Sequence, residues 1–205
     1  VEAGVKVKLT SYLDFRALGT YSDAKYLNNA DVKYLHSTSA DYTTDVVYNK
    51  GMRESGTPLT ATSLGLSYHQ KGWFIDVNGN WYDRIYLSYS PCMRYGETLE
   101  TMGNVDNDGN YEVPGQAMGH GGWMLDLSIG KSIYLKRGSL SINLMITNAL
   151  NNQSIVTGGY EQSRSDYTLN AEGSINNVRA YKFSQNPKKY YAFGTNGMLN
   201  IAYKF

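Results

Sequence analysis

The residue types that most often do chemistry are few and scattered in this chain. The three histidines lie far apart, at His36, His69 and His120. His36 is followed directly by Ser37, but no acidic residue evidently orients the imidazole, as nucleophilic catalysis would require. We therefore expect no catalytic residues and no enzyme activity.

One acidic stretch, NVDNDGNYE, comes closest to a metal site. Asn104, Asp106 and Asp108 are spaced by two and a glycine follows, as in the first half of a calcium loop. The position that needs a bidentate glutamate is occupied by Gly115, and Glu112 is out of register. The stretch is a weak calcium candidate, and the simpler interpretation is an acidic surface loop. We expect no cofactor.

The composition argues against a nucleic-acid partner and against a membrane-spanning helix. The formal net charge is +1, and no basic cluster is longer than the pair Lys188–Lys189. The one cysteine, Cys92, cannot form an internal disulfide. The sequence contains no run of about 18 apolar residues, which a transmembrane helix would need. A membrane β-barrel gives a much weaker hydropathy signal, so this observation is compatible with one.

Alternation of apolar and polar residues is the strongest pattern in the sequence. Residues 1–16 alternate throughout, with Val5 and Val7 of one parity and Lys6 and Lys8 of the other. A period of two predicts β-strands with two different faces. Further alternating runs occupy residues 60–69, 73–89, 123–135, 139–148 and 191–205. We therefore expect about six strands, the first of them continuous over residues 1–16.

The connections between these runs are of two kinds. QKG and KRG are short turns, whereas the segments around 22–59, 90–122 and 150–188 are long and rich in Asn, Asp, Gly, Ser and Tyr. Long loops are uncommon in compact soluble domains, whereas outer-membrane barrels combine short periplasmic turns with long extracellular loops. The pattern predicts an all-β fold, a transmembrane antiparallel β-barrel. Trp123 is expected in the outer aromatic girdle and Trp73 in the inner one.

A set of about six strands does not close a membrane barrel, because the smallest such barrels have about eight. An open edge in lipid would leave backbone amides without partners. We therefore expect residues 1–205 to be the C-terminal part of a larger barrel, completed by a remaining barrel segment. The last strand would run inward and the first outward, with Tyr203 and Phe205 at the barrel-closing terminus. A soluble β-sandwich is the alternative fold.

Three stretches resemble the C-terminal barrel of SusC-like TonB-dependent outer-membrane transporters of the Bacteroidetes. They are WFIDVNGNWYDRIYLSYSP, NLMITNALNNQSIVTGGYEQSR and PKKYYAFGTNGMLNIAYKF. The resemblance covers Thr60–Phe205, and residues 1–59 fit only through their alternation. It implies a barrel of about 22 strands around an N-terminal plug domain. It also implies a SusD-like surface lipoprotein and TonB as partners, although the plug and the TonB-contacting segment are absent from this chain.

The resemblance implies active import of a nutrient across the bacterial outer membrane, with a passive diffusion porin as the alternative. Tyrosine rings can stack on sugars, and Asn, Asp and Arg can hydrogen-bond hydroxyl groups or peptide amides, so we expect an oligosaccharide or oligopeptide cargo. The residues expected to line its path near the outer mouth are Tyr82, Arg84, Tyr160, Glu161 and Arg164. A water-filled lumen needs polar residues whatever the cargo, and for Arg164 we prefer an ion pair with Glu161 within the loop.

Overall fold

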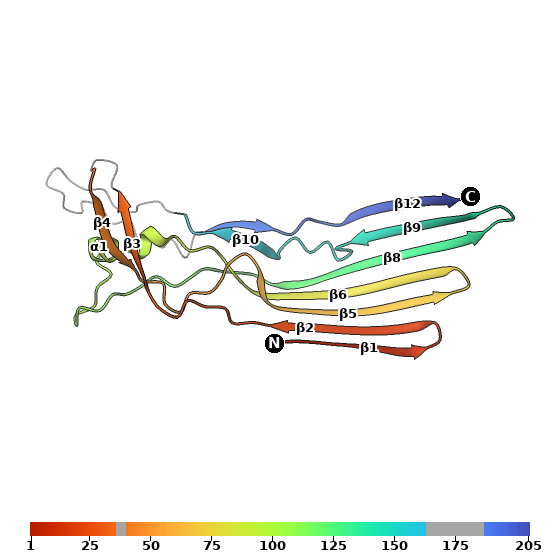
Figure 1. Cartoon of the computed structure of the whole chain (residues 1–205), viewed down its shortest axis with the longest axis horizontal. Coiled ribbons are helices and arrows are strands. Elements are labelled where there is room, and N and C mark those ends of the chain that lie inside the picture. Colours follow the sequence, from red (N-terminus) through yellow and green to blue (C-terminus); the bar gives the residue numbers. More distant parts are fainter. Residues whose placement is uncertain (36–39, 163–186) are drawn as a thin grey trace.

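One large antiparallel sheet dominates the computed structural model, which describes residues 1–35, 40–162 and 187–205 (Figure 1). Its long strands are β1 (Glu2–Thr10), β2 (Leu13–Tyr21), β5 (Pro58–Gln70), β6 (Trp73–Tyr86), β8 (Gly122–Tyr134), β9 (Ser139–Thr147) and β12 (Asn196–Lys204). They follow one another across the sheet in that order, and the short strand β7 (Met118–Gly119) also pairs with β6. We call these seven long strands the main sheet. The predicted all-β, antiparallel class is confirmed, and the described residues form no closed barrel.

The N-terminal alternating stretch is a hairpin, so the prediction of one continuous strand over residues 1–16 is wrong. The chain reverses at Ser11 and Tyr12, where the Thr10 hydroxyl accepts a hydrogen bond from the Tyr12 amide (3.3 Å). This turn contains neither the glycine nor the proline that usually marks a reversal. Because Val7 then pairs with Phe15, the alternation continues across the turn and hides it. The main sheet consequently has seven strands rather than six, and β1 runs in the same direction as β12 instead of opposite to it.

The two ends of the main sheet differ in their connections (Figure 1). Short turns at residues 11–12, 71–72 and 135–138 lie at one end, which we call the turn end. Gly72 is required in the second of these turns, because its φ is +79° and a Cβ there would collide with the Ser132 carbonyl. The long connections 22–57, 87–121 and 148–195 all leave from the opposite end. The predicted division into short and long connections is confirmed.

The two faces of the main sheet differ in chemistry. Residues paired across neighbouring strands share a face, because side chains alternate along each strand. One row on the apolar face consists of Val7, Phe15, Leu66, Val77, Leu127 and Ile146. Many members of this face are 40–60% exposed, among them Val5, Leu64, Leu66 and Ile129. The predicted division of residues between the two faces is therefore confirmed.

Most of the buried apolar residues lie in the long connections, and the two that belong to the main sheet, Leu59 and Ile85, lie at the ends of β5 and β6 next to these connections. We call the described parts of these connections, residues 22–57, 87–121 and 148–195 without 36–39 and 163–186, the loop head. It holds two ribbons and a short helical segment: β3 (Ala30–Leu35) with β4 (Tyr42–Val47), β10 (Val156–Tyr160) with β11 (Lys188–Tyr191), and η1 (Pro91–Arg94) followed by α1 (Gly96–Thr101). Leu87, Ala117 and Val156 form its buried cluster. No helix in the described ranges is long and apolar enough to span a membrane.

Candidate functional site

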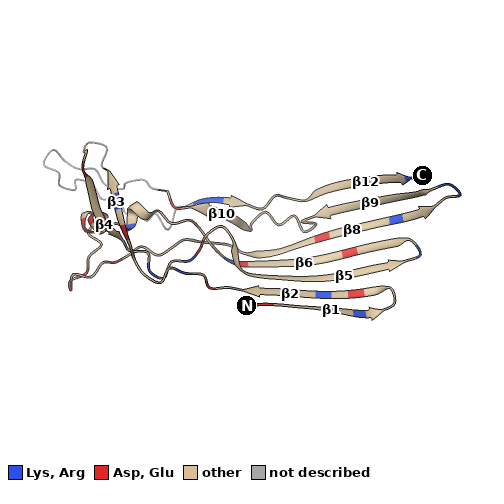
Figure 2. Cartoon of the chain, viewed as in Figure 1, with Lys and Arg blue, Asp and Glu red and all other residues tan. Residues whose placement is uncertain are grey.

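Hydrogen-bonded side chains connect the strands on the polar face of the main sheet. Ser67 donates to Asp76 (2.5 Å) and accepts from Arg16 (3.2 Å), which joins β2, β5 and β6. The other cross-strand bonds are Ser63 to Asn80 (2.7 Å), Asn80 to Asp126 (2.9 Å) and Ser128 to Asn143 (3.0 Å). Charged positions on the long strands are few: they fall on β1, β2, β6 and β8, and on Lys204 at the end of β12 (Figure 2). Cross-strand hydrogen bonds thus satisfy many of the polar groups on this face, although one buried Asp14 oxygen has no hydrogen-bond partner among the described residues.

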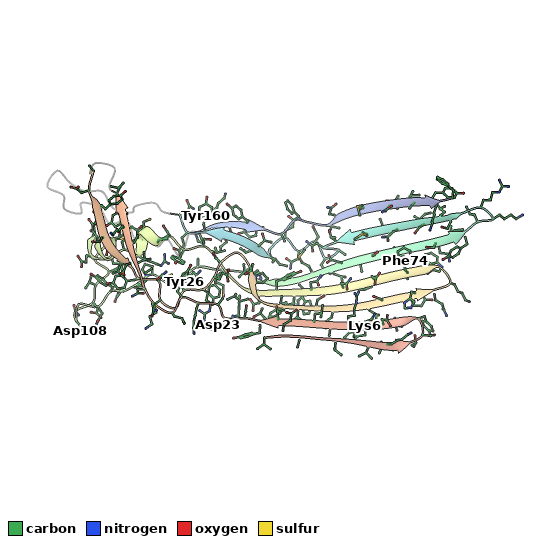
Figure 3. All side chains as sticks on the ribbon, in the orientation of Figure 1. Lys6, Asp23, Tyr26, Phe74, Asp108 and Tyr160 are labelled. Carbon is green, nitrogen blue, oxygen red and sulfur yellow. The ribbon has the colours of Figure 1, made fainter. Side chains whose placement is uncertain are left out.

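A charged cluster lies where β2 and β6 meet the loop head; Figure 3 labels Asp23 at this point. The Asp23 carboxylate accepts hydrogen bonds from Arg53 (2.8 Å) and Arg84 (3.1 Å), and the Lys25 ammonium lies 3.5 Å from it. We call these four residues the Asp23 cluster. The hydrogen bond from Arg53, together with the charges of Arg53 and Lys25, holds the pKa of Asp23 below its usual value. The same hydrogen bond raises the pKa of Arg53. Three cations therefore surround one carboxylate.

Two tyrosine rings hold the arginines of the Asp23 cluster in place. The Arg84 guanidinium lies 4.5 Å from the centre of the Tyr21 ring and also donates to the Ser22 carbonyl (2.9 Å). The Arg53 guanidinium lies 5.0 Å from the centre of the Tyr86 ring. Stacking on a ring face and hydrogen bonding at the edge use different surfaces of a guanidinium, so each arginine is held from two directions.

Two of the predicted path residues lie on β6 at the end nearest the loop head. Tyr82 pairs with Ala61 of β5 and is half-buried. Arg84 belongs to the Asp23 cluster, with its side chain 20% exposed. The backbone of Arg84 has a φ of +55°, which interrupts the regular strand two residues after Tyr82. The structure thus places this pair at the loop-head end of the sheet, where Arg84 is engaged in an ion pair, and their role along a cargo path stays a prediction.

The other predicted path residues lie on or after β10. Tyr160 is 45% exposed, and the centre of its ring is 6.2 Å from that of Tyr190 (Figure 3). The backbone of Tyr160 forms an isolated parallel β-bridge with Ser88. Arg164 lies outside the described residues, so its expected ion pair with Glu161 stays a prediction. Glu161, however, does not face a path, because its side chain is 1% exposed and carries a different partner.

That partner is Arg94, a functional candidate that the sequence did not reveal. Its guanidinium donates to both Glu161 oxygens, at 2.6 and 2.9 Å, and is itself fully buried. The same two terminal nitrogens also donate to the carbonyls of Ser90 (3.1 Å) and Pro114 (3.0 Å), whereas the buried Nε has no hydrogen-bond partner among the described residues. The Arg94 carbonyl accepts from the Tyr48 amide (2.8 Å), so one residue contacts all three connections of the loop head. No local motif could have predicted this pairing across 67 positions.

The side chain at the centre of the calcium candidate is hydrogen-bonded within its own loop. Asp106 accepts hydrogen bonds from the amides of Asp108 (2.9 Å) and Asn110 (2.8 Å) and from the Asn110 side chain (3.0 Å). The side-chain hydrogen bond from Asn110 is the main cause that lowers the pKa of Asp106. The described residues include no group of three or more His, Cys, Asp or Glu that could hold a metal ion. The Asp106 carboxylate is therefore engaged by the backbone and side chain of its own turn.

The remaining predicted residues lie at the two ends of the main sheet. Trp123 pairs with Trp81 near the loop head, whereas Trp73 lies at the turn end beneath the Lys131 ammonium (4.5 Å). Tyr203 and Phe205 are also at the turn end, with ring centres 6.3 Å apart. His69 and His120 fall on opposite ends of the sheet, and His36 lies outside the described residues.

Comparisons with known proteins found no matching family model, no matching curated protein and no matching solved structure. The resemblance to SusC-like transporters therefore stays a prediction from the sequence.

Proposed function

We propose that this chain is part of the outer-membrane β-barrel of a TonB-dependent importer of the SusC-like kind. The observation that carries the proposal is the two-faced main sheet, with a half-exposed apolar face opposite a hydrogen-bonded polar face. Soluble proteins rarely expose apolar surface of this extent, whereas barrel strands place apolar residues against lipid and polar residues in the lumen.

The dimensions and edges of the sheet also support a barrel. β5 has 13 residues and β6 has 14, against about 5–6 for a typical strand and about 9–11 needed to cross a bilayer. Within the main sheet, as far as the structure describes it, β1 and β12 are the edge strands, and each pairs on one side only. In lipid the free amides and carbonyls of both edges need partners, which the remaining barrel segment supplies.

The orientation follows from the connections. Outer-membrane barrels keep short turns on the periplasmic side and long loops on the outer side, so the loop head faces the exterior. There it meets the SusD-like surface lipoprotein, and oligosaccharide or oligopeptide cargo passes along the polar face. TonB acts through the part of the protein outside this chain. The protein changes no covalent bond of its cargo.

Uptake by cells that carry the full-length protein tests this function. Fluorescent oligosaccharides and oligopeptides are supplied, with and without a protonophore that collapses the proton-motive force. We expect uptake of at least one cargo class to stop with the protonophore and in a strain without TonB. Uptake that continues in both cases would instead establish a passive diffusion porin. Failure of the protein to fractionate with the outer membrane would overturn both functions.

A further inference from the structure

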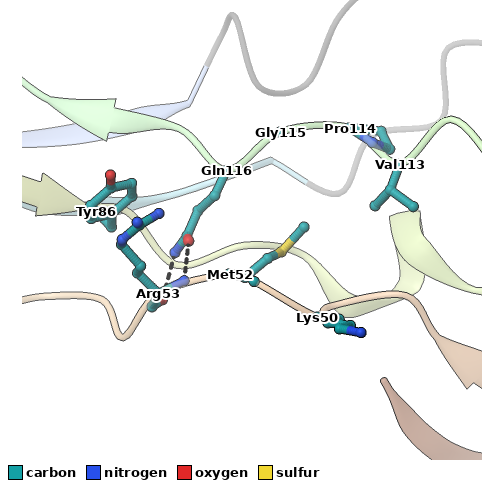
Figure 4. Close-up of a pocket in the computed structure, with 9 residues that line it drawn as sticks. Lys50, Met52, Arg53, Tyr86, Val113, Pro114, Gly115 and Gln116 are labelled. Carbon is teal, nitrogen blue, oxygen red and sulfur yellow. Dashed lines mark hydrogen bonds between the residues drawn. The ribbon is translucent and has the colours of Figure 1, made fainter. Parts of the chain in front are cut away.

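A pocket of about 320 Å³ lies beside the Asp23 cluster (Figure 4). Arg53 and Tyr86 lie on one side of it, and Val113 and Pro114 on the other. Lys50, Gly51, Met52, Gly115 and Gln116 complete its lining. The described residues that line it include two basic residues and no acidic one. Its size is at the lower end of the range for small-molecule sites, about 300–1,000 Å³.

Arg53 is fixed at the wall of this pocket from three directions. The side-chain amide of Gln116 accepts from the Arg53 amide (2.7 Å) and donates to the Arg53 carbonyl (2.8 Å), which locks the backbone (Figure 4). The guanidinium stacks on Tyr86 and donates through Nε to Asp23. Its two terminal nitrogens have no hydrogen-bond partner among the residues that the structure describes, and its side chain is 30% exposed. A preorganised pair of N–H donors thus remains available.

The charge around Arg53 favours an anion. Lys25, Arg53 and Arg84 share the single Asp23 carboxylate, which leaves two positive charges in excess. Lys50, another lining residue, adds a third. The terminal N–H groups of a guanidinium match a carboxylate in a planar, bidentate arrangement. The apolar side chains of Met52 and Val113, which also line the pocket, are suited to the carbon skeleton that bears this group.

We propose that this pocket binds the carboxylate of an anionic cargo through Arg53. The inference rests on the proposed function, because it names the chemical class of what the importer selects. Two sources offer this group: the carboxylate of a uronic acid residue in an oligosaccharide and the terminal carboxylate of an oligopeptide. A neutral oligosaccharide or an amidated peptide offers no such partner to Arg53.

Calorimetric titration of the full-length protein in detergent tests this site. The probes are trigalacturonate with its fully methyl-esterified form, and N-acetyl-trialanine with its C-terminal amide. We expect one of the two acids to bind about 10- to 100-fold more tightly than its neutral counterpart, the range for hydrogen bonds to charged groups. The acid that binds identifies the source. Equal affinity within both pairs, or no binding of either acid, would overturn the proposal.

Two variants test whether Arg53 causes the tighter binding of the acid. Arg53→Gln should weaken binding of the preferred acid about 10- to 100-fold and leave the neutral form unchanged. Arg137→Gln makes the same charge change in the turn between β8 and β9, at the other end of the sheet, and should leave binding unaltered. If Arg53→Gln does not fold, the acid–neutral comparison on the unmodified protein still decides. Acid-selective binding without protonophore-sensitive uptake would overturn only the transport function, whereas energised uptake without acid selectivity would overturn only this site.

Discussion

A cationic residue placed on the apolar face of β9 should destabilise the inserted protein. Leu144 is 39% exposed and pairs with Ile129 on one side and Leu199 on the other. It lies five residues beyond Ser139 at the turn end of β9. At about 3.4 Å per residue and a tilt of about 40°, that is about 13 Å into an apolar band about 25 Å tall. Leu144 is therefore close to the middle of the membrane in the proposed barrel.

At this depth an outward-facing arginine costs about 2–4 kcal/mol. Leu144→Arg should accordingly lower the folding equilibrium constant in lipid vesicles roughly 30- to 900-fold. The assay is a reversible denaturant titration of the full-length protein in vesicles, followed by tryptophan fluorescence.

Met145 provides a matched control, because it is the next residue along the same strand. It lies at nearly the same depth, is 37% exposed, and pairs with Ser128 and Met198 on the polar face. Met145→Arg should therefore cost much less than Leu144→Arg, and Thr147→Arg, on the same polar face, should also be tolerated. Equal destabilisation at 144 and 145, or the reverse order, would refute the assignment of the apolar face to lipid.

Three further perturbations address the loop head and the terminus. Arg94→Met leaves the buried Glu161 carboxylate without its partner, so we expect a loss of about 3–5 kcal/mol, detected as faster protease cleavage of the loops. Replacing both residues by methionine should recover part of this loss, and no recovery would contradict the ion-pair explanation. The hydrogen bond to Glu100 raises the pKa of Tyr111 to about 12, so this contribution to stability is complete below about pH 10 and is lost as the pH rises through about 12. Glu100→Gln should lower that pKa in absorbance titrations referenced to Tyr111→Phe, and an unchanged value would exclude Glu100 as its cause. Deleting Phe205, which is fully exposed beyond β12, should lower the surface yield of the full-length protein without disturbing strand pairing; an unchanged yield would contradict its expected role at the barrel-closing terminus.

The Asp23 cluster and the Arg94–Glu161 pair show which parts of the site the sequence leaves open. Tyr82 and Arg84 could be placed near one end of a strand because the alternating run containing them ends at the second long connection. Their partners come from other connections: Asp23 and Arg53 are 61 and 31 positions from Arg84. In loops without periodicity, sequence position carries little information about which side chains meet.

The hairpin at Ser11 and Tyr12 is a feature of the sheet that the sequence pattern also could not predict. Alternation reports only the face on which a side chain lies. A register shift between Lys8 and Thr10 lets Val7 pair with Phe15, which has the same parity, so a single strand and this hairpin give the same sequence pattern.

The sequence by itself determined the two faces of the sheet, its antiparallel class and the division into short and long connections. These follow from local geometry, because successive side chains of any strand point to opposite sides. Only the tertiary structure decided the number of strands, the direction of β1 and the residues gathered around Asp23 and Arg94. These depend on backbone pairing and on charge contacts between distant segments, whose free energy is set by burial and geometry in three dimensions.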